Sequence, residues 1–353
     1  MNTKFFFAAL VCCMGLGFAS EASANSWRVN YDMRANADFQ DLNAAMADER
    51  VVDGDIIYMD KGCTISIEQT ITKAVTVIGP GYFIGENDAD EAYFSNNIYL
   101  KAKGIKLTGL HTSTIYIYTS ENVIERCRVT GNIIAQDYET DNVAIRSNFI
   151  DGQIKGLGYN GSKGWNILNN ILYRHGNQQN IFSPIYNFYN ALIDHNAIHF
   201  YNSGAYYNNN YGYCIHDVYN STITNNLIRQ YYGTKYNVIN TASLGCNNII
   251  SHNVLSYQTA YSDYPNNKFN MTNVYANERE AAPRDQYYEL ADDSPAKGYA
   301  EDGGDCGPWD GAYPYVLSGY PLYVPRFESI TVPSQPDESG NLKIQMVIKN
   351  QNK

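Results

Sequence analysis

A short pattern that occurs five times constrains the fold of this chain more than any other feature. An aliphatic residue is followed by two variable residues, an Asn, one variable residue and a second aliphatic residue. The copies are Ile145-x-x-Asn148-x-Ile150, Ile167-x-x-Asn170-x-Leu172, Ile193-x-x-Asn196-x-Ile198, Ile223-x-x-Asn226-x-Ile228 and Ile250-x-x-Asn253-x-Leu255. A degenerate earlier copy has Cys127 in the Asn position, between Ile124 and Val129. The Asn-to-Asn steps are 170−148 = 22, 196−170 = 26, 226−196 = 30 and 253−226 = 27 residues.

A fixed short core within a variable period of more than twenty residues is typical of a β-solenoid. Each repeat forms one coil, and the coils stack as parallel strands while loops take up the differences in length. The aliphatic residues should point inward. The Asn should lie in a tight turn, where it tolerates a left-handed backbone and its amide can bond to the Asn of the next coil. We therefore predict an all-β parallel β-helix with a ladder of Asn148, Asn170, Asn196, Asn226 and Asn253.

The N-terminus has the features of a secretory signal peptide over residues 1–24. Lys4 gives a basic start, Phe5 to Phe18 form an apolar stretch, and Ala22-Ser23-Ala24 is a small-residue cleavage pattern. The apolar stretch is too short for a transmembrane helix. These features predict an exported protein, in the periplasm, on the cell surface or outside the cell, with no membrane span.

The rest of the chain divides into three predicted regions. Residues 25–55 form an N-terminal cap, because Asp38 can cap a short helix that carries Phe39, Leu42 and Met46 on one face. Residues 56–311 form the parallel β-helix, with a Gly- and Asp-rich turn at 301–307 closing the last coil. Residues 312–353 form a C-terminal extension, in which two segments with the composition of β-strands predict a hairpin.

Composition narrows the possible partners. The net charge of −11 argues against nucleic acid, and an acidic polysaccharide would need a local basic site. The 32 tyrosines suit either stacked β surfaces or sugar contacts. Five cysteines follow the signal segment, with no closely spaced pair. We predict buried thiols and no metal site.

Several segments resemble the pectin-lyase-like right-handed β-helix proteins. They are Phe39-Gln-Asp-Leu-Asn-Ala-Ala, Asp53-Gly-Asp-Ile-Ile-Tyr, Val75-Thr-Val-Ile-Gly-Pro-Gly, and the ending Ser294-Pro-Ala with Asp305-Cys-Gly-Pro-Trp. The chain is similar in particular to exported bacterial β-helix proteins without an assigned activity. The resemblance implies a right-handed helix and a substrate groove along one sheet and the loops that precede it. Because the superfamily contains lyases, hydrolases and adhesins, it raises the expectation of a polysaccharide partner and leaves open whether the protein is an enzyme.

Strand alternation predicts which residues line that groove. We expect Lys155, Ser183, His216 and Ile239 to point outward in one column. The other candidate binding residues follow the second aliphatic position of each repeat or lie in the loops beyond it. They are Tyr173, His175, His199, Tyr201, Tyr206, Tyr207 and Tyr231.

These residues leave three functions open. The favoured one is polysaccharide binding, in which Tyr and His rows contact sugar rings without catalysis. A polysaccharide lyase acting on a uronate would use Lys155 or His216 as base and Arg174 or Arg229 as carboxylate clamp, with calcium as a possible cofactor. His216 precedes Asp217, but neighbouring strand residues should face opposite sides. A hydrolase would need paired carboxylates, and no two of Asp137, Asp151, Asp194 and Asp217 are expected in one column of adjacent coils. The third function is a structural or adhesive surface protein.

Overall fold

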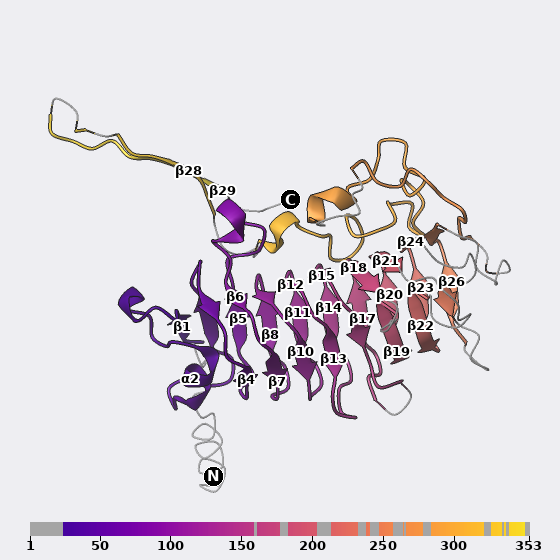
Figure 1. The fold of residues 1–353 in the computed structure, drawn as a ribbon, viewed down its shortest axis with the longest axis horizontal. Helices are drawn as coiled ribbons and strands as arrows, with labels where there is room; N and C mark the ends of the chain where they lie inside the picture. The colour runs from indigo at the N-terminus through magenta and orange to yellow at the C-terminus, as the bar shows by residue number, and fades with distance from the viewer. Residues whose placement is uncertain are drawn as a thin grey trace, which may run out of the picture.

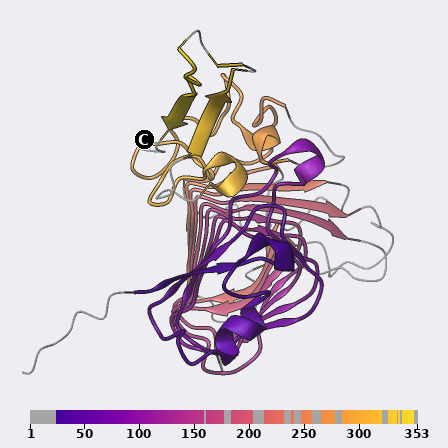
Figure 2. The same ribbon diagram turned by 90° about the vertical axis from the view of Figure 1, so that its left-hand side faces the viewer.

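The computed structural model describes residues 24–158, 161–176, 183–202, 213–231, 238–240, 247–256, 264, 266–277, 284–320, 326–333, 335–336 and 339–349. Residues 1–23 of the predicted signal peptide lie outside this part. Three long parallel sheets stack into a solenoid whose coils follow one another along its axis (Figure 1). An end-on view shows the sheets surrounding one interior (Figure 2). The chain is therefore an all-β parallel β-helix.

Each coil passes through the sheets in the order A, B and C. Sheet A has ten strands: β1 Ser26–Val29, β2 Ile56–Met59, β5 Thr76–Ile78, β8 Lys106–Thr108, β11 Val123–Glu125, β14 Ala144–Arg146, β17 Asn166–Leu168, β20 Leu192–Asp194, β23 Thr222–Thr224 and β26 Ile249–Ser251. Sheet B has nine: β3 Thr64–Ile65, β6 Tyr93–Phe94, β9 His111–Thr112, β12 Arg128–Val129, β15 Phe149–Ile150, β18 Ile171–Gly176, β21 Ala197–Asn202, β24 Leu227–Tyr231 and β27 Val254–Leu255. Sheet C has eight: β4 Gln69–Ile71, β7 Ile98–Leu100, β10 Ile115–Ile117, β13 Ile133–Ala135, β16 Ile154–Lys155, β19 Ile185–Tyr189, β22 Ile215–Tyr219 and β25 Ile239–Asn240.

The core follows from the alternation of side chains along these short strands. Stacking in register places the first aliphatic residue of each repeat in one inward column of sheet A, where Ile145, Ile167, Ile193 and Ile223 are fully buried. The second aliphatic residue does the same in sheet B. The repeat thus encodes two inward columns and the turn between them.

The asparagine side chains form a continuous ladder in that turn. Asn148, Asn170, Asn196 and Asn226 each donate from Nδ2 to Oδ1 of the next asparagine, at 2.9–3.0 Å. Asn253 donates in the same way to Asn267, which lengthens the ladder by one residue. Each of the five repeat asparagines also donates to an isoleucine carbonyl in sheet A. All five are fully buried, so these bonds satisfy polar groups that have no access to water.

The left-handed residue of the turn is the one before the ladder asparagine. Ser147, Asn169, His195, Asn225 and His252 have φ between 52° and 56°. The prediction that the ladder Asn itself takes this conformation was wrong, because its side chain is needed inside the turn while the preceding residue makes the bend.

The N-terminal region contains a strand that the sequence pattern did not reveal. Strand β1 pairs in parallel with β2 and becomes the first strand of sheet A. Helix α2 (Leu42–Ala47) follows it and contributes Leu42, Ala45 and Met46 to the buried core. Its N-cap is Asp41, which accepts a bond from Ala44 N at 2.8 Å, whereas Asp38 accepts one from Arg28 N. The helix therefore starts one turn later than predicted.

The segment 284–320, which we call the strap, does not close the last coil as expected. It runs back along the solenoid over the corner between sheets A and B (Figure 1). Glu301 N bonds to Asn225, Pro308 O accepts from Asn169, Tyr313 O accepts from Ser147, and Ser318 O accepts from Tyr82 N. It contains the short 3₁₀ helices η4 (Asp285–Tyr288) and η5 (Leu317–Gly319). Two others come earlier in the chain. They are η1 (Met33–Ala35) and η2 (Glu86–Asp88), and Asp88 of η2 forms an ion pair with Arg284 of the strap at 3.1 Å.

The strap gives the protein a second buried apolar cluster outside the solenoid. Outward-facing residues of sheet B pack against residues of the strap and of the segment before it. The cluster contains Tyr82, Phe149, Ile171, Tyr173, Ala197, Leu227, Val254, Val274, Tyr275, Tyr288, Ala296, Ala300, Cys306 and Tyr315. Much of the outer face of sheet B is therefore covered.

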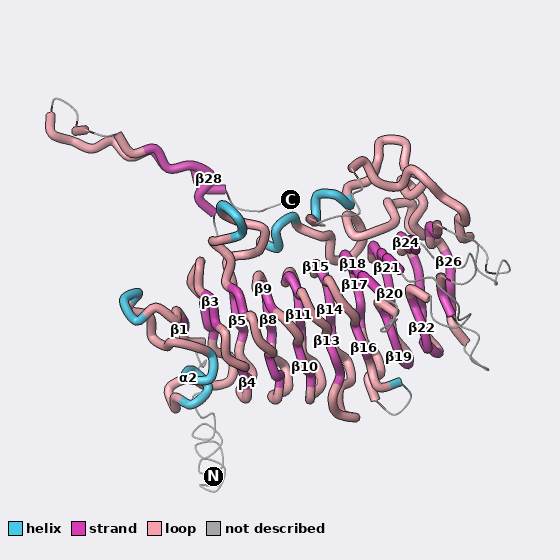
Figure 3. Tube along the Cα trace, viewed as in Figure 1, coloured by secondary structure: helices cyan, strands magenta, loops and turns pink. Residues whose placement is uncertain are grey.

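After the strap, β28 (Arg326–Thr331) and β29 (Gln345–Lys349) form an antiparallel hairpin that projects from the body (Figures 1 and 2). Cys63, Cys127, Cys214 and Cys306 are buried and none forms a disulfide, while Cys246 lies outside the described residues. No helix in the described part of the chain is long and apolar enough to cross a membrane. Figure 3 shows how little of the molecule is helical.

Candidate functional site on the outer face of sheet C

The outer face of sheet C presents one column of partly exposed side chains. Register places Lys155 beside Tyr186, Tyr186 beside His216, and His216 beside Asn240. On the other side of Lys155 the column continues through Ile134, Tyr116, Tyr99 and Thr70. Lys155 and His216 are thus two strands apart, which corresponds to roughly 10 Å.

Two members of the predicted column were wrong. Ser183 is buried and precedes β19, and its carbonyl accepts a bond from Gln153 Nε2 at 2.7 Å. Ile239 is inward, opposite Ile215. Tyr186 occupies the outward position next to Lys155, and the register places residue 240 next to His216. The Ile239 error arose because two consecutive apolar residues, Val238 and Ile239, leave the phase of a short strand undetermined. The Ser183 error arose because the strand predicted at residues 181–183 begins at Ile185.

The prediction that His216 and Asp217 face opposite sides was also wrong. Asp217 has φ 52°, and the equivalent residue in the coil before, Asn187, has φ 71°. This left-handed residue breaks the alternation, so residues 216 and 217 are both partly exposed between the inward Ile215 and Val218. His216 Nε2 lies 3.4 Å from Asp217 Oδ1. A strand irregularity therefore pairs the imidazole with a carboxylate.

Tyrosines surround this pair. The rings of Tyr213 and Tyr186 lie 5.0 and 5.4 Å from that of His216. The hydroxyls of Tyr186 and Tyr219 are directed to the Asp217 carboxylate, the latter at 3.5 Å. We call Lys155, Tyr186, Tyr213, His216, Asp217 and Tyr219 the sheet C cluster. It combines a cation, a carboxylate, an imidazole and phenol groups on a rigid sheet.

The surroundings determine the charge of this cluster near neutral pH. Partial burial lowers the pKa of His216 below its ordinary value, and the nearby Asp217 charge opposes that shift only in part. Burial and the charge and hydrogen bond of Asp217 raise the pKa of Tyr186. His216 is consequently neutral at pH 7 and able to accept a proton, while Tyr186 keeps its proton and donates it.

The other candidate residues fall into three groups. Tyr173, His199 and Arg229 share a column on sheet B, and Tyr173 and His199 are buried beneath the chain that covers this sheet. His199 Nε2 lies 2.8 Å from the Tyr275 hydroxyl. Arg174 is directed toward sheet C, since its Nη1 donates to Asn132 Oδ1 at 3.4 Å. The side chains of His175, Tyr201 and Tyr231, and the whole of Tyr206 and Tyr207, lie outside the described residues.

Some connections that lead into the strands of sheet C are long, as the repeat spacing predicted. The connections from sheet B to sheet C lengthen from 151–153 to 177–184 and 203–214 in successive coils. The connections from sheet C to sheet A also vary, which the repeat did not indicate, as 156–165, 190–191 and 241–248 show.

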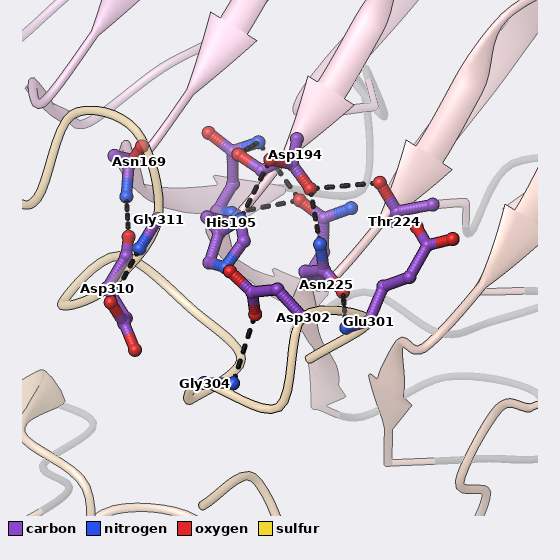
Figure 4. A network of polar contacts seen from close by, with 12 residues as sticks. Asn169, Asp194, His195, Thr224, Asn225, Glu301, Asp302, Gly304, Asp310 and Gly311 are labelled. Carbon is purple, nitrogen blue, oxygen red and sulfur yellow. Dashed lines mark hydrogen bonds and ion pairs between the residues drawn. The ribbon is translucent and has the colours of Figure 1, made fainter. Parts of the chain in front are cut away.

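A second polar cluster lies at the corner beneath the strap (Figure 4). Asp194 contacts His195 Nδ1 at 2.8 Å and accepts bonds from Thr224 and Asn225, both at 2.9 Å. The His195 side chain is only 4% exposed, and Gly311 packs against its ring. The Asp194 carboxylate is thus occupied by groups of the fold. We interpret this cluster as an anchor for the strap and not as a catalytic site.

No group of three or more His, Cys, Asp or Glu side chains in the described part of the chain is arranged to hold a metal ion. Comparison with known proteins adds no assignment. No family model matches the chain, and no curated protein matches its sequence.

Proposed function

We propose that this protein is exported and binds an extended polysaccharide along the outer face of sheet C, at the sheet C cluster. The observation that supports the proposal is the column of Lys155, Tyr186 and His216, flanked by Tyr213, Tyr219 and Asp217. Phenol and imidazole groups offer both ring contacts and hydrogen bonds to a sugar. The face is straight and repeats every ~4.8 Å, so it suits a linear polymer better than a compact ligand.

The test is a glycan array probed with the protein and with Lys155→Ala/His216→Ala. We expect the double variant to bind its best array ligand at least about tenfold more weakly, a change of roughly 1.4 kcal/mol. Lys103→Ala is the matched control, because Lys103 forms an exposed ion pair with Glu121 away from the site. Since His216 is half-buried and contacts two rings, thermal unfolding must show that the double variant remains folded. Equal binding by parent and double variant would refute the site.

The contact between His216 and Asp217 favours a second candidate, a lyase acting on a uronate-containing polysaccharide. A neutral imidazole beside a carboxylate can remove the proton next to a uronate carboxylate, and Lys155 can neutralise the developing charge. An absorbance assay for unsaturated uronate products separates the candidates. His216→Gln should abolish product formation by a lyase and reduce simple binding only a few-fold.

The pH dependence provides a further check on the lyase candidate. The base works only when it is deprotonated, and the pKa of His216 is lowered by burial. Turnover should therefore be constant through neutral pH and fall on acidification, as His216 gains a proton. The measurement is kcat/KM from pH 4 to 9. A rate that rises steadily above neutral pH would assign the base to another group, such as Lys155.

A further inference from the structure

The two 3₁₀ turns of the strap meet at one buried carboxylate, that of Asp285. This residue begins η4 and is only 3% exposed. Its Oδ2 accepts bonds from Ser318 N of η5 at 2.6 Å and from the Tyr315 hydroxyl at 3.3 Å, and its Oδ1 accepts one from Gln286 N at 2.9 Å. The Tyr315 hydroxyl also shares a hydrogen bond with that of Tyr82, a fully buried residue between β5 and η2. One carboxylate therefore links both turns of the strap and, through Tyr315, the solenoid.

The groups around this carboxylate carry no compensating charge. Within the described residues, Asp285 forms no ion pair. The neighbouring Arg284 is directed to Asp88 at 3.1 Å, and Arg126 donates to the last backbone carbonyl of the strap at 3.3 Å. Burial raises the pKa of the Cys127 thiol to about 12 and those of the two phenols well above their ordinary value, so these groups are neutral. Burial likewise raises the pKa of the Asp285 carboxyl, and its hydrogen bonds oppose that shift only in part.

We propose that Asp285 is a proton-controlled latch, which holds η4 and η5 on the solenoid when it is protonated and loosens them when it is ionised. A protonated carboxyl is neutral and needs no cation in a buried site, whereas the ionised form loses its hydration and gains only neutral donors. Helix η4 also carries Tyr288, whose ring lies 4.6 Å from that of His199 on sheet B. Loosening η4 therefore uncovers part of the outer face of sheet B.

The direction of the pH effect follows from the position of the proton. The stabilisation of the strap is fully present below the ordinary carboxyl pKa, about 4, and is lost as the pH rises through the raised pKa of Asp285. His199 acts in the opposite sense, because burial lowers its pKa and charging it costs stability below about pH 6.5. Only a comparison with a variant that lacks the carboxyl therefore isolates the contribution of Asp285.

The experiment is the thermal unfolding temperature of the full chain from about pH 4 to about pH 8. We expect the difference between Asp285→Asn and the parent to grow by at least about 2 °C over this range, in favour of the variant. Asp292→Asn is the matched control and should follow the parent, because it removes an exposed carboxyl of the strap that lies 3.6 Å from Lys297. Tyr315→Phe removes a hydroxyl that stabilises the ionised carboxyl, so its loss of stability should continue to higher pH.

A tryptophan in the strap reports the latch locally. Trp309 Nε1 donates to Tyr288 O at 2.7 Å, and its ring packs edge-on against that of Tyr315, with 5.3 Å between the centroids. In protein labelled with fluorotryptophan, the Trp309 fluorine signal should shift as the pH rises in the parent but not in Asp285→Asn. The signal of Trp165, which is fully buried in the solenoid core, should stay constant in both.

Three results would overturn the proposal. The first is an equal pH dependence of the unfolding temperature in the parent and in Asp285→Asn, and the second is a Trp309 signal that does not change with pH. If Asp285→Asn does not fold, Tyr315→Phe decides the question. A loss of stability over the same pH range as in the parent would then be the third.

Discussion

Replacing Asn196 with Leu should destabilise the protein by about 3 kcal/mol or more, because several buried polar groups lose their partners at once. Asn196 Nδ2 donates to the carbonyls of Ile167 and Asp194 and to Asn226 Oδ1. Its own Oδ1 accepts from both the backbone N and the Nδ2 of Asn170. Leucine has the same number and branching of side-chain heavy atoms but satisfies none of these groups, and no water reaches the fully buried turn.

The measurement is the free energy of unfolding from urea denaturation. Asn166→Leu is the matched control, since it makes the same change in the preceding coil at an outward, partly exposed position of sheet A. We expect the control to lie within about 0.5 kcal/mol of the parent. Similar losses for the two variants would show that the ladder contributes nothing beyond the general cost of the substitution.

Removing the strap should have the other large effect. A chain that ends at Asn277 lacks the partners of Phe149, Ile171 and Leu227, which then face water on sheet B. Each large apolar side chain contributes roughly 1.5–3 kcal/mol when fully buried. We expect the truncated chain to unfold at least ~10 °C below the parent or to aggregate, as open apolar patches promote.

A chain that ends at Tyr320 is the control for this truncation. It keeps the strap and loses only the hairpin, which belongs to a separate sheet. Its unfolding temperature should remain within about 2 °C of the parent value. If both truncations are equally stable, the strap is a surface appendage and not part of the folded core.

The sequence determined the solenoid because its signal is local and repeated. One Asn and two aliphatic residues at fixed spacing specify a turn and two inward columns, and stacking repeats that specification in every coil. The ladder from Asn148 to Asn253 follows from this constant spacing within each repeat. The spacing also predicted long connections in some coils, but only the structure shows how each remainder divides between the loop before sheet C and the loop after it.

Only the tertiary structure decided the composition of the site. The strand was predicted at residues 181–183 but forms at Ile185–Tyr189, so Ser183 was chosen and Tyr186 was missed. The left-handed Asp217 that brings a carboxylate to His216 leaves no mark in the residue pattern, because Asp is acceptable in either conformation.

Long-range packing decided which face remains open. Tyr173 and His199 have the residue types of a sugar-binding row. Tyr275 and Tyr288, which come much later in the sequence, pack over this row and bury it. The sequence shows the alternation within each strand. Whether the outer face of sheet B or that of sheet C is covered depends on where the strap and the segment before it pack in the folded chain.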